Sequence, residues 1–334
     1  MTTKTKVSVF VIAILALFAT ILGGILFFQK QQSGSVDTTD VSSAPEIGMP
    51  EGDSEGDFYT SDGVRIHYWY YNRGTSIVTI FLHGGPGGST SDLRNTGQAT
   101  AYADTFGSLL AFDQRGGGQS EKNADLAPTI TYPRFIQDIN ELRSALIPGH
   151  EVVIFGRSFG GPLAARYADS HPEGVRGYIL AAPGPFVANK EILDEQRAAL
   201  LSTISADEMT RIAARDREIV LRLAKERGTL EHETSLILPG EDSDLDVGSA
   251  FSTYGGYFTE DEYHRLSALT DVPTLIEYGA YDTQVPPLSI EAMKPYLPQA
   301  TFLELAGGHG AAYTHEEEFF AGVQKLFDSI KNNL

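Results

Sequence analysis

The sequence of 334 residues contains no cysteine, and this absence excludes several kinds of chemistry. Without thiols the chain forms no disulfide, holds no thiolate zinc site, carries no cysteine-linked lipid and has no cysteine nucleophile. Nucleophilic catalysis by this chain would therefore need another residue, such as a serine whose hydroxyl is activated by a neighbouring base.

Positive charge is also scarce. Lysine and arginine number 25 against 44 aspartate and glutamate residues, which gives a formal net charge of −19 at pH 7. An acidic surface repels nucleic-acid phosphates and anionic lipid headgroups, so the composition argues against nucleic acid as a partner. The length favours one large domain that carries an inserted subdomain and buries a large core.

Charged residues are missing from residues 7–28, although Lys4 and Lys6 precede this segment and Lys30 follows it. As a helix the segment would be about 33 Å long, which is enough to cross the hydrocarbon core of a bilayer. The basic flank at residues 1–6 favours a cytoplasmic N-terminus and an extracellular remainder. The sequence therefore predicts a single-pass anchor in the lipid bilayer of the cell membrane. A cleaved signal peptide, which would release a secreted protein, is the alternative.

Residues 29–57 are polar, lack periodicity and are predicted to form a flexible stalk. Beyond them, short apolar segments rich in β-branched residues indicate strands. The first two flank Ser61-Asp62-Gly63 and form a predicted hairpin. The predicted strands are residues 58–60, 64–71, 76–82, 109–112, 152–155, 178–181, 274–278 and 302–305.

Apolar residues recur at helical spacing between these strands, for example over residues 135–146 and 319–330, the latter after a capping box at residues 314–317. Alternation of strands and helices predicts the α/β class, with a mostly parallel, twisted sheet of about eight strands covered by helices on both faces. The charged, helical residues 186–262 interrupt the alternation. We interpret them as a cap inserted over the carboxyl ends of the strands, between the two parts of the core at residues 58–185 and 263–334.

The segment Gly156-Arg157-Ser158-Phe159-Gly160 follows a predicted strand and precedes a helical pattern. In this context G-x-S-x-G indicates a nucleophilic serine on a sharp, strained turn at the carboxyl edge of the sheet. The sequence therefore predicts Ser158 as the nucleophile. Arg157 is either solvated or a ligand for a substrate carboxylate.

Two further residues follow predicted strands. Asp282 lies in Gly279-Ala280-Tyr281-Asp282 after residues 274–278, and His309 lies in Gly307-Gly308-His309-Gly310 after residues 302–305. The order serine, acid, histidine resembles that of the α/β-hydrolases, in which the histidine takes the proton of the serine and the acid orients the histidine. The resemblance implies the α/β-hydrolase fold.

The segment His83-Gly84-Gly85-Pro86-Gly87 directly follows the predicted strand that ends at Leu82. Glycines let the backbone approach a substrate oxygen, so the N–H groups of Gly84 or Gly85, together with that of Phe159, are the predicted oxyanion hole. His83 is interpreted as a structural hydrogen-bonding residue. Asp113 and Arg115 are interpreted as a buried network that supports the site.

These motifs together resemble the proline iminopeptidase family of α/β-hydrolases over residues 58–334. The motifs are residues 83–87, Asp113-Gln114-Arg115-Gly116, residues 156–161, residues 279–282 and Gly308-His309. The resemblance implies removal of N-terminal residues from short peptides. It also implies Ser158 as nucleophile, His309 as base, Asp282 as its orienting partner, and no metal or organic cofactor.

Members of this family often read the free amine of the substrate with acidic residues of the cap. The candidates in this sequence are Glu191, Glu195, Glu231 and Glu233. Glu231-His232-Glu233 is only loosely similar to a metal cluster, because adjacent positions of a helix do not converge, and no metal site is predicted.

Two other functions stay open. The same machinery would serve a carboxylesterase or small-amide hydrolase, whose substrate is a small ester or amide. A catalytically silent binding protein is a second alternative. Haloalkane dehalogenases and many epoxide hydrolases need an aspartate where Ser158 stands, so their mechanism is excluded.

Overall fold

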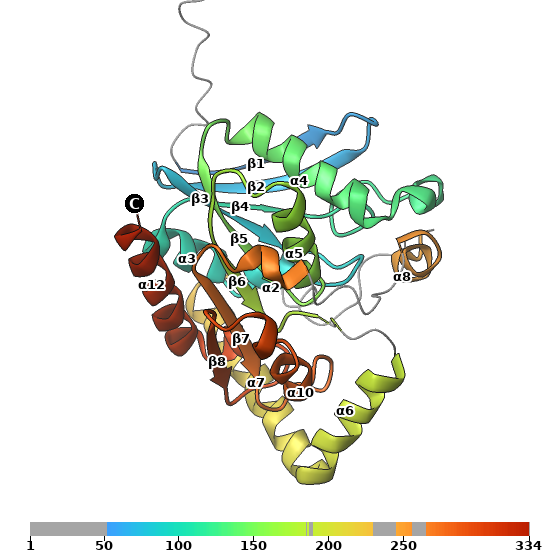
Figure 1. Cartoon of the computed structure of the whole chain (residues 1–334), viewed down its shortest axis with the longest axis vertical. Coiled ribbons are helices and arrows are strands. Elements are labelled where there is room, and N and C mark those ends of the chain that lie inside the picture. The colour runs from blue at the N-terminus through green and yellow to red at the C-terminus, as the bar shows by residue number, and fades with distance from the viewer. Residues whose placement is uncertain (1–51, 185, 187–189, 230–244, 256–264, 334) are drawn as a thin grey trace, which may run out of the picture. The chain divides into compact units, whose positions relative to one another are not determined.

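The structure is a computed structural model that describes residues 52–184, 186, 190–229, 245–255 and 265–333. Its central element is an eight-stranded sheet with the order β1-β2-β4-β3-β5-β6-β7-β8 (Figure 1). The strands are β1 (Gly52–Tyr59), β2 (Arg65–Asn72), β3 (Ile77–Leu82), β4 (Leu109–Phe112), β5 (Glu151–Arg157), β6 (Val175–Ala181), β7 (Thr274–Gly279) and β8 (Thr301–Leu305). All eight predicted strands are confirmed, with ends that differ by a few residues.

Strand β2 pairs antiparallel with β1 and β4, and every other pair of neighbours in the sheet is parallel. The predicted hairpin and the mostly parallel sheet are therefore confirmed. The predicted end of the stalk is wrong, because β1 begins at Gly52, which pairs with Asn72. The sequence gives little sign of this strand, since β1 lies at the edge of the sheet and its first residues are polar and exposed.

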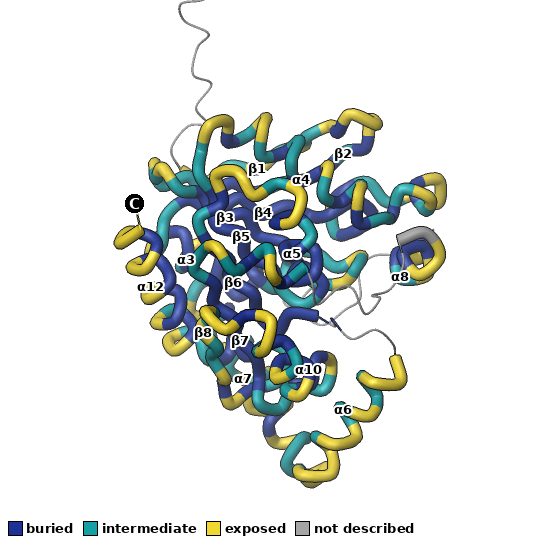
Figure 2. The backbone as a smooth tube through the Cα atoms, in the orientation of Figure 1, coloured by how far each residue is buried: buried dark blue, intermediate teal, exposed yellow. Residues whose placement is uncertain are grey.

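Helices cover the strands, and most strand residues between them are buried, as Figure 2 shows. The α-helices are α2 (Ser91–Asn95), α3 (Gln98–Phe106), α4 (Tyr132–Leu146), α5 (Gly160–Ser170), α6 (Lys190–Thr203), α7 (Ala206–Glu226), α8 (Val247–Ala250), α10 (Pro287–Glu291), α11 (Ala311–Thr314) and α12 (Glu316–Asn332). The short helical turns are η1 (Ala124–Thr129), the π-helix η3 (Phe251–Gly255), η4 (Leu266–Leu269) and η5 (Lys294–Tyr296).

The two faces of the sheet bury separate apolar clusters. Val152 and Ile154 of β5 pack in the cluster that includes α4, α5 and α10. Val153 and Phe155 of the same strand pack in the cluster with α3, α11 and α12. This alternation is the period of two that a strand imposes, and it explains why a strand covered on both faces reads as a continuous apolar run.

Helix α12 begins where the sequence predicts, but the predicted capping box is wrong. Its N-cap residue is His315, and no side chain caps the helix. Thr314 is the last residue of α11, and its hydroxyl lies 3.0 Å from His315 Nδ1 and 3.4 Å from the carbonyl oxygen of Ala311. Thr314 therefore ends the preceding helix and is not the N-cap of α12.

Helices from the predicted cap segment contact loops that follow the strands. Arg197 of α6 donates from Nε to the carbonyl of Thr283, after β7, at 2.6 Å. Asp216 of α7 accepts from the N–H of Gly308, after β8, at 3.0 Å. Helix α8 packs on the loop after β3, where a Cβ on Gly87 would lie 2.7 Å from Val247. These three helices therefore lie along the carboxyl edge of the sheet.

Among the helices in the described residues, none combines the length and apolar character that a bilayer crossing requires. The predicted anchor at residues 7–28 lies outside the described residues, as does the stalk up to residue 51.

Candidate active site

Ser158 occupies the turn between β5, which ends at Arg157, and α5, which begins at Gly160. Its φ of 51° lies in the left-handed region, which is strained for a residue with a side chain. The turn is held by its backbone: the Ser158 N–H donates to Ala181 at 2.9 Å, and the Ser158 carbonyl accepts from Gly161 at 2.8 Å and Gly184 at 3.1 Å. The structure thus has the sharp strand-to-helix turn that the motif predicts.

Two glycines let this turn approach the end of β3. A Cβ on Gly160 would lie 2.0 Å from the carbonyl oxygen of Leu82, which is shorter than any contact that the site could accommodate. A Cβ on Gly84 would lie 3.0 Å from the Cβ of Ser158 and 3.5 Å from its hydroxyl oxygen. The absence of side chains here brings the predicted oxyanion loop directly beside Ser158.

Asp282 and His309 are joined by a hydrogen bond of 2.7 Å between Asp282 Oδ2 and His309 Nδ1. The other carboxylate oxygen of Asp282, Oδ1, accepts from the N–H of Gln284 at 2.7 Å and of Val285 at 2.9 Å. The side chain of Asp282 is fully buried and that of His309 is 12% exposed. The carboxylate is therefore fixed by its own loop and oriented toward the imidazole.

A short path of contacts connects this pair to Ser158. Gly184 donates to the Ser158 carbonyl, and a Cβ on Gly184 would lie 3.3 Å from the side chain of Val285, whose N–H binds Asp282. Within the described chain no hydrogen bond joins the Ser158 hydroxyl to His309. Such contacts are often long before substrate binds.

His83 orients the loop beside Ser158. Its Nε2 accepts from the N–H of Gln114 at 2.8 Å, and its Nδ1 lies 2.6 Å from the carbonyl oxygen of Gly84. Burial lowers the pKa of His83, although nearby Asp113 acts in the opposite direction, so the ring is neutral. Because Nε2 accepts, the single proton is on Nδ1 and is donated to Gly84.

Asp113 and Arg115 are both fully buried, as expected from the sequence. Asp113 accepts from the N–H and the hydroxyl of Thr90, at 2.7 and 2.9 Å, and so holds the chain that follows the glycine loop. Arg115 pairs with Asp138 at 2.6 Å and with Asp62 at 3.1 Å. These side chains stabilise the loops around the site.

Arg157 is not solvated, which corrects one of the two readings from the sequence. Its side chain is 14% exposed, forms an ion pair with Asp92, and lies over the ring of Tyr313 with 4.8 Å between the guanidinium carbon and the ring centroid. Burial alone would lower the pKa of Arg157, but Tyr313, Asp92 and other acidic neighbours raise it above its usual value. Arg157 is the last residue of β5 and pairs in register with the small residue Ala181 of β6. Its side chain lies against Tyr313 of α11.

Glu277 of β7 is a buried group that the sequence reading missed. It is 1% exposed, and its Oε1 has no hydrogen-bond partner in the described residues. Burial raises its pKa to about 8, Arg157 acts against this shift, and Asp282 adds to it. The only signal in the sequence is an acidic residue within an otherwise apolar run, Thr274–Gly279.

The predicted substrate-binding acids are not gathered at Ser158 in the described part of the chain. Glu191 and Glu195 are exposed on α6, while Glu231 and Glu233 lie outside the described residues. The described residues contain no group of three or more histidine and acidic side chains arranged to hold a metal ion.

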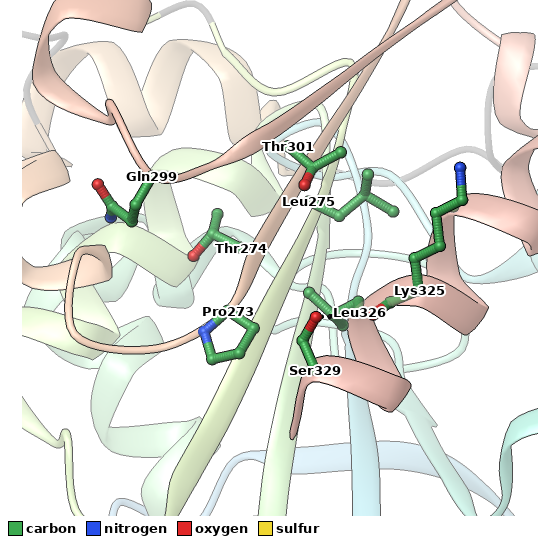
Figure 3. A pocket seen from close by; sticks show the side chains of 9 residues that line it. Pro273, Thr274, Leu275, Gln299, Thr301, Lys325, Leu326 and Ser329 are labelled. Atoms are coloured by element: carbon green, nitrogen blue, oxygen red, sulfur yellow. Dashed lines mark hydrogen bonds between the residues drawn. The ribbon is translucent and has the colours of Figure 1, made fainter. Parts of the chain in front are cut away.

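A recess of about 210 Å³ lies at the amino ends of β7 and β8, opposite the carboxyl edge that carries the candidate site (Figure 3). Thr274 and Thr301, the first residues of these strands, line it together with Lys325 of α12. Because Asp282 and His309 follow the opposite ends of the same strands, this recess is separate from the candidate site.

Comparisons with known proteins agree with this geometry. A family model described as the alpha/beta hydrolase fold matches residues 78–316. The proline iminopeptidase of Xanthomonas citri is 30% identical over 302 residues, which cover 77% of this chain and 91% of that protein. The Arabidopsis thaliana proline iminopeptidase is 27% identical, with coverage of 77% and 75%.

Among solved structures, the proline iminopeptidase of Mycobacterium smegmatis aligns with a TM-score of 0.59 and 20% identity. The alignment covers 84% of this chain and 100% of that chain. At this level of identity the likeness concerns the fold.

Proposed function

The chain belongs to the alpha/beta hydrolase fold family, among its proline iminopeptidase-like serine hydrolases, and we propose that it releases the N-terminal residue of short peptides through an acyl-enzyme. The observation that carries the proposal is the hydrogen bond between buried Asp282 and His309 at the edge of the sheet that also carries Ser158. The two relatives are proline iminopeptidases, which supports a peptide substrate with proline at its N-terminus.

In the proposed reaction the Ser158 hydroxyl attacks the carbonyl carbon of the first peptide bond while His309 Nε2 accepts the hydroxyl proton. Nδ1–H of His309 donates to Asp282, which holds the ring in this tautomer and stabilises the imidazolium that forms. The tetrahedral intermediate collapses as His309 returns the proton to the leaving amine. Water then attacks the acyl-enzyme, again with His309 as base, and the free amino acid is released.

The negative charge on the tetrahedral oxygen needs N–H donors that are not already used. The N–H groups of Gly85 and Phe159 donate to no other group of the described chain. The Gly84 carbonyl is bound by His83, and in a planar peptide the N–H of Gly85 points to the opposite side. This orientation supports Gly85 as the loop donor and His83 as the residue that fixes it, while Phe159, at the start of α5, supplies the second donor.

The decisive experiment compares substrates with and without a free amine. The full-length chain, purified in detergent, is assayed with proline β-naphthylamide, its N-acetylated form and p-nitrophenyl acetate. We expect turnover of the first and a loss of at least about 100-fold on acetylation, because an amine recognised by a buried charge is worth several kcal/mol. Equal turnover of the blocked substrate, or activity on the ester alone, would identify an esterase or amidase instead.

Ser158→Ala is the control for the chemistry. It should abolish turnover and prevent labelling by a fluorophosphonate probe, which reacts with an activated serine. A wild-type chain that resists the probe would support the silent binding protein.

We further propose that residues 7–28 anchor the enzyme in the cell membrane, with the N-terminus inside and the catalytic part outside. The proposal is based on their apolar length and on the basic residues before them. In intact cells, external protease should remove the catalytic part, and alkaline carbonate should leave the full-length chain in the membrane fraction. Release of a shortened chain into the medium would indicate signal-peptide cleavage.

A further inference from the structure

Helix α7 combines few buried side chains with polar attachments near its middle and at its C-terminal end. Of its residues, Ala206–Glu226, only Ile212 and Ala224 are buried. Apolar burial therefore contributes little to its placement, and polar contacts with the core must supply much of it.

One of these attachments is on the loop that leads to His309. Arg215 donates from Nη2 to the carbonyl of Ala306, and the neighbouring Asp216 accepts at Oδ2 from the N–H of Gly308, at 3.0 Å. The remaining oxygen of Asp216, Oδ1, accepts from Arg215 at 2.8 Å. Adjacent residues of one helix thus bind both an acceptor and a donor of the loop.

The loop makes its other backbone hydrogen bonds within the core. The N–H of Gly307 donates to Leu305 at 2.8 Å, and its carbonyl accepts from Tyr281 at 3.0 Å. The N–H of Gly308, directly before His309, has Asp216 as its partner. The side chain of Asp216 is 16% exposed, so water can only partly take its place as the hydrogen-bond partner of the Gly308 N–H.

The C-terminal end of α7 is attached to the chain that follows α11. Arg227, which follows the helix, forms an ion pair with Glu316 of α12 and donates to the Thr96 carbonyl at 3.0 Å. Gln98 binds the same Glu316 at 3.1 Å and the carbonyl of Ala312, in α11, at 2.8 Å. Helix α7 is therefore tied to the chain on both sides of His309.

We propose that Asp216 is a positioning residue for His309, and that the docked position of α7 sets the placement of the catalytic base. This inference rests on the proposed function. Asp216 holds the peptide group between Gly307 and Gly308, one peptide group before that of His309, so a cap that moves away from the loop also loosens the imidazole. The cap helix thereby couples substrate enclosure to the chemistry, in addition to covering the site.

The carboxylate has two properties that substitutions can separate. Asp216→Asn keeps an oxygen that accepts from Gly308 but removes the negative charge. Asp216→Ala removes the acceptor, and the Gly308 N–H loses its partner. Glu218→Ala, two residues along on the exposed surface of the same helix, is the matched control for loss of an acid from α7.

The test measures kcat and KM for proline β-naphthylamide and the rate of labelling by a small fluorophosphonate. The small probe needs Ser158 and His309 but spans too little of the cap to depend on substrate contacts there. For Asp216→Ala we expect kcat and the labelling rate to fall together by about tenfold, with KM changed less than about twofold. Asp216→Asn should stay within about threefold of wild type, and Glu218→Ala should match wild type.

Three results would overturn the proposal: wild-type labelling of Asp216→Ala, a change confined to KM, or an Asp216→Asn variant as slow as Asp216→Ala. Arg215→Ala provides a second test if Asp216→Ala does not fold. The Arg215 side chain is 43% exposed, so its loss should preserve the fold and lower the labelling rate about threefold. If wild type itself does not label, the proposed function fails and not the role of Asp216.

Discussion

The turn that carries Ser158 and the helices α6 and α7 are held in place by different forces. The Ser158 turn is fixed by backbone hydrogen bonds and by glycines that lie against neighbouring backbone. Helix α6 has no buried residue, and α7 is attached chiefly through charged side chains. Exposed ion pairs contribute about 0–1 kcal/mol each, whereas buried backbone contacts open only with large parts of the fold. We infer that Ser158 is placed by the stable part of the fold and that enclosure of the substrate is left to helices that open more easily.

The largest expected effect tests the stable part. In Asp282→Asn the amide oxygen must take the place of Oδ1, because Gln284 and Val285 both donate there. The amide nitrogen then faces His309 Nδ1, which must accept, so Nε2 carries the proton and cannot take that of Ser158. We expect kcat to fall by about 10⁴-fold with little change in stability.

The measurement for Asp282→Asn is single-turnover kinetics with proline β-naphthylamide, with thermal unfolding as the check on the fold. A loss of less than about tenfold would mean that the Asp282–His309 pair does not act in the reaction.

The sequence predicts the strands and the positions of the motif residues, but not the surroundings of every side chain in the site. The strand runs and the positions of Ser158, Asp282 and His309 follow from local pattern, because burial on two faces selects apolar residues and a tight turn selects glycine. The solvated alternative for Arg157 is wrong and Glu277 was missed, since the surroundings of both come from register between β5, β6 and β7. No local pattern encodes such register.

The cap was less predictable still. Asp216 is one of several acidic residues in α7, and only the helix position shows that it reaches Gly308. The capping box at Thr314 failed because Thr314 is already the last residue of α11, which places the N-cap of α12 at His315. A polar contact over a long separation decides the first outcome and a short preceding helix decides the second, and periodicity contains no information about either.

The second-largest expected effect is on the pH dependence of the free energy of unfolding, and it comes from the buried carboxyl of Glu277. It tests the contrast between buried and exposed acids. Its pKa rises from 4.5 to about 8 on folding, so between these values the folded state binds a proton that the unfolded state has lost. The free energy of unfolding should therefore fall as pH rises from about 4.5 to about 8, by on the order of 4 kcal/mol from this group.

Glu277→Gln should remove this slope, and Glu191→Gln, on exposed α6, should leave it unchanged. The measurement is urea unfolding at pH 5 and pH 8.5 for the three chains. Parallel pH profiles of Glu277→Gln and wild type would show that the buried carboxyl is ionised in the folded state.

Two glycine substitutions compare the stability of the Ser158 turn with that of the end of α7. In Gly160→Ala the new methyl group would meet the Leu82 carbonyl oxygen at 2.0 Å, so the turn must move and we expect a loss of about 3 kcal/mol or more. Gly228, after α7, has φ +71°, and no atom of the described residues lies within 4 Å of a Cβ there, so Gly228→Ala should cost only the left-handed conformation, about 1 kcal/mol. Chemical unfolding measures both, and equal losses would contradict the contrast.

The smallest expected effect concerns α6. Arg197 donates to the Thr283 carbonyl at 2.6 Å, beside Asp282, but Asp282 is held independently by Gln284 and Val285. Arg197→Ala should therefore loosen α6 by about 1 kcal/mol and raise KM a fewfold, while kcat and fluorophosphonate labelling stay unchanged. Limited proteolysis between α6 and α7 should become faster. Lys190→Ala, at a side chain 86% exposed, is the control and should change none of these. If Arg197→Ala instead slows labelling as Asp216→Ala is expected to, then α6 also holds the reacting groups, and the division between a fixed catalytic edge and a loosely attached cap fails for both helices.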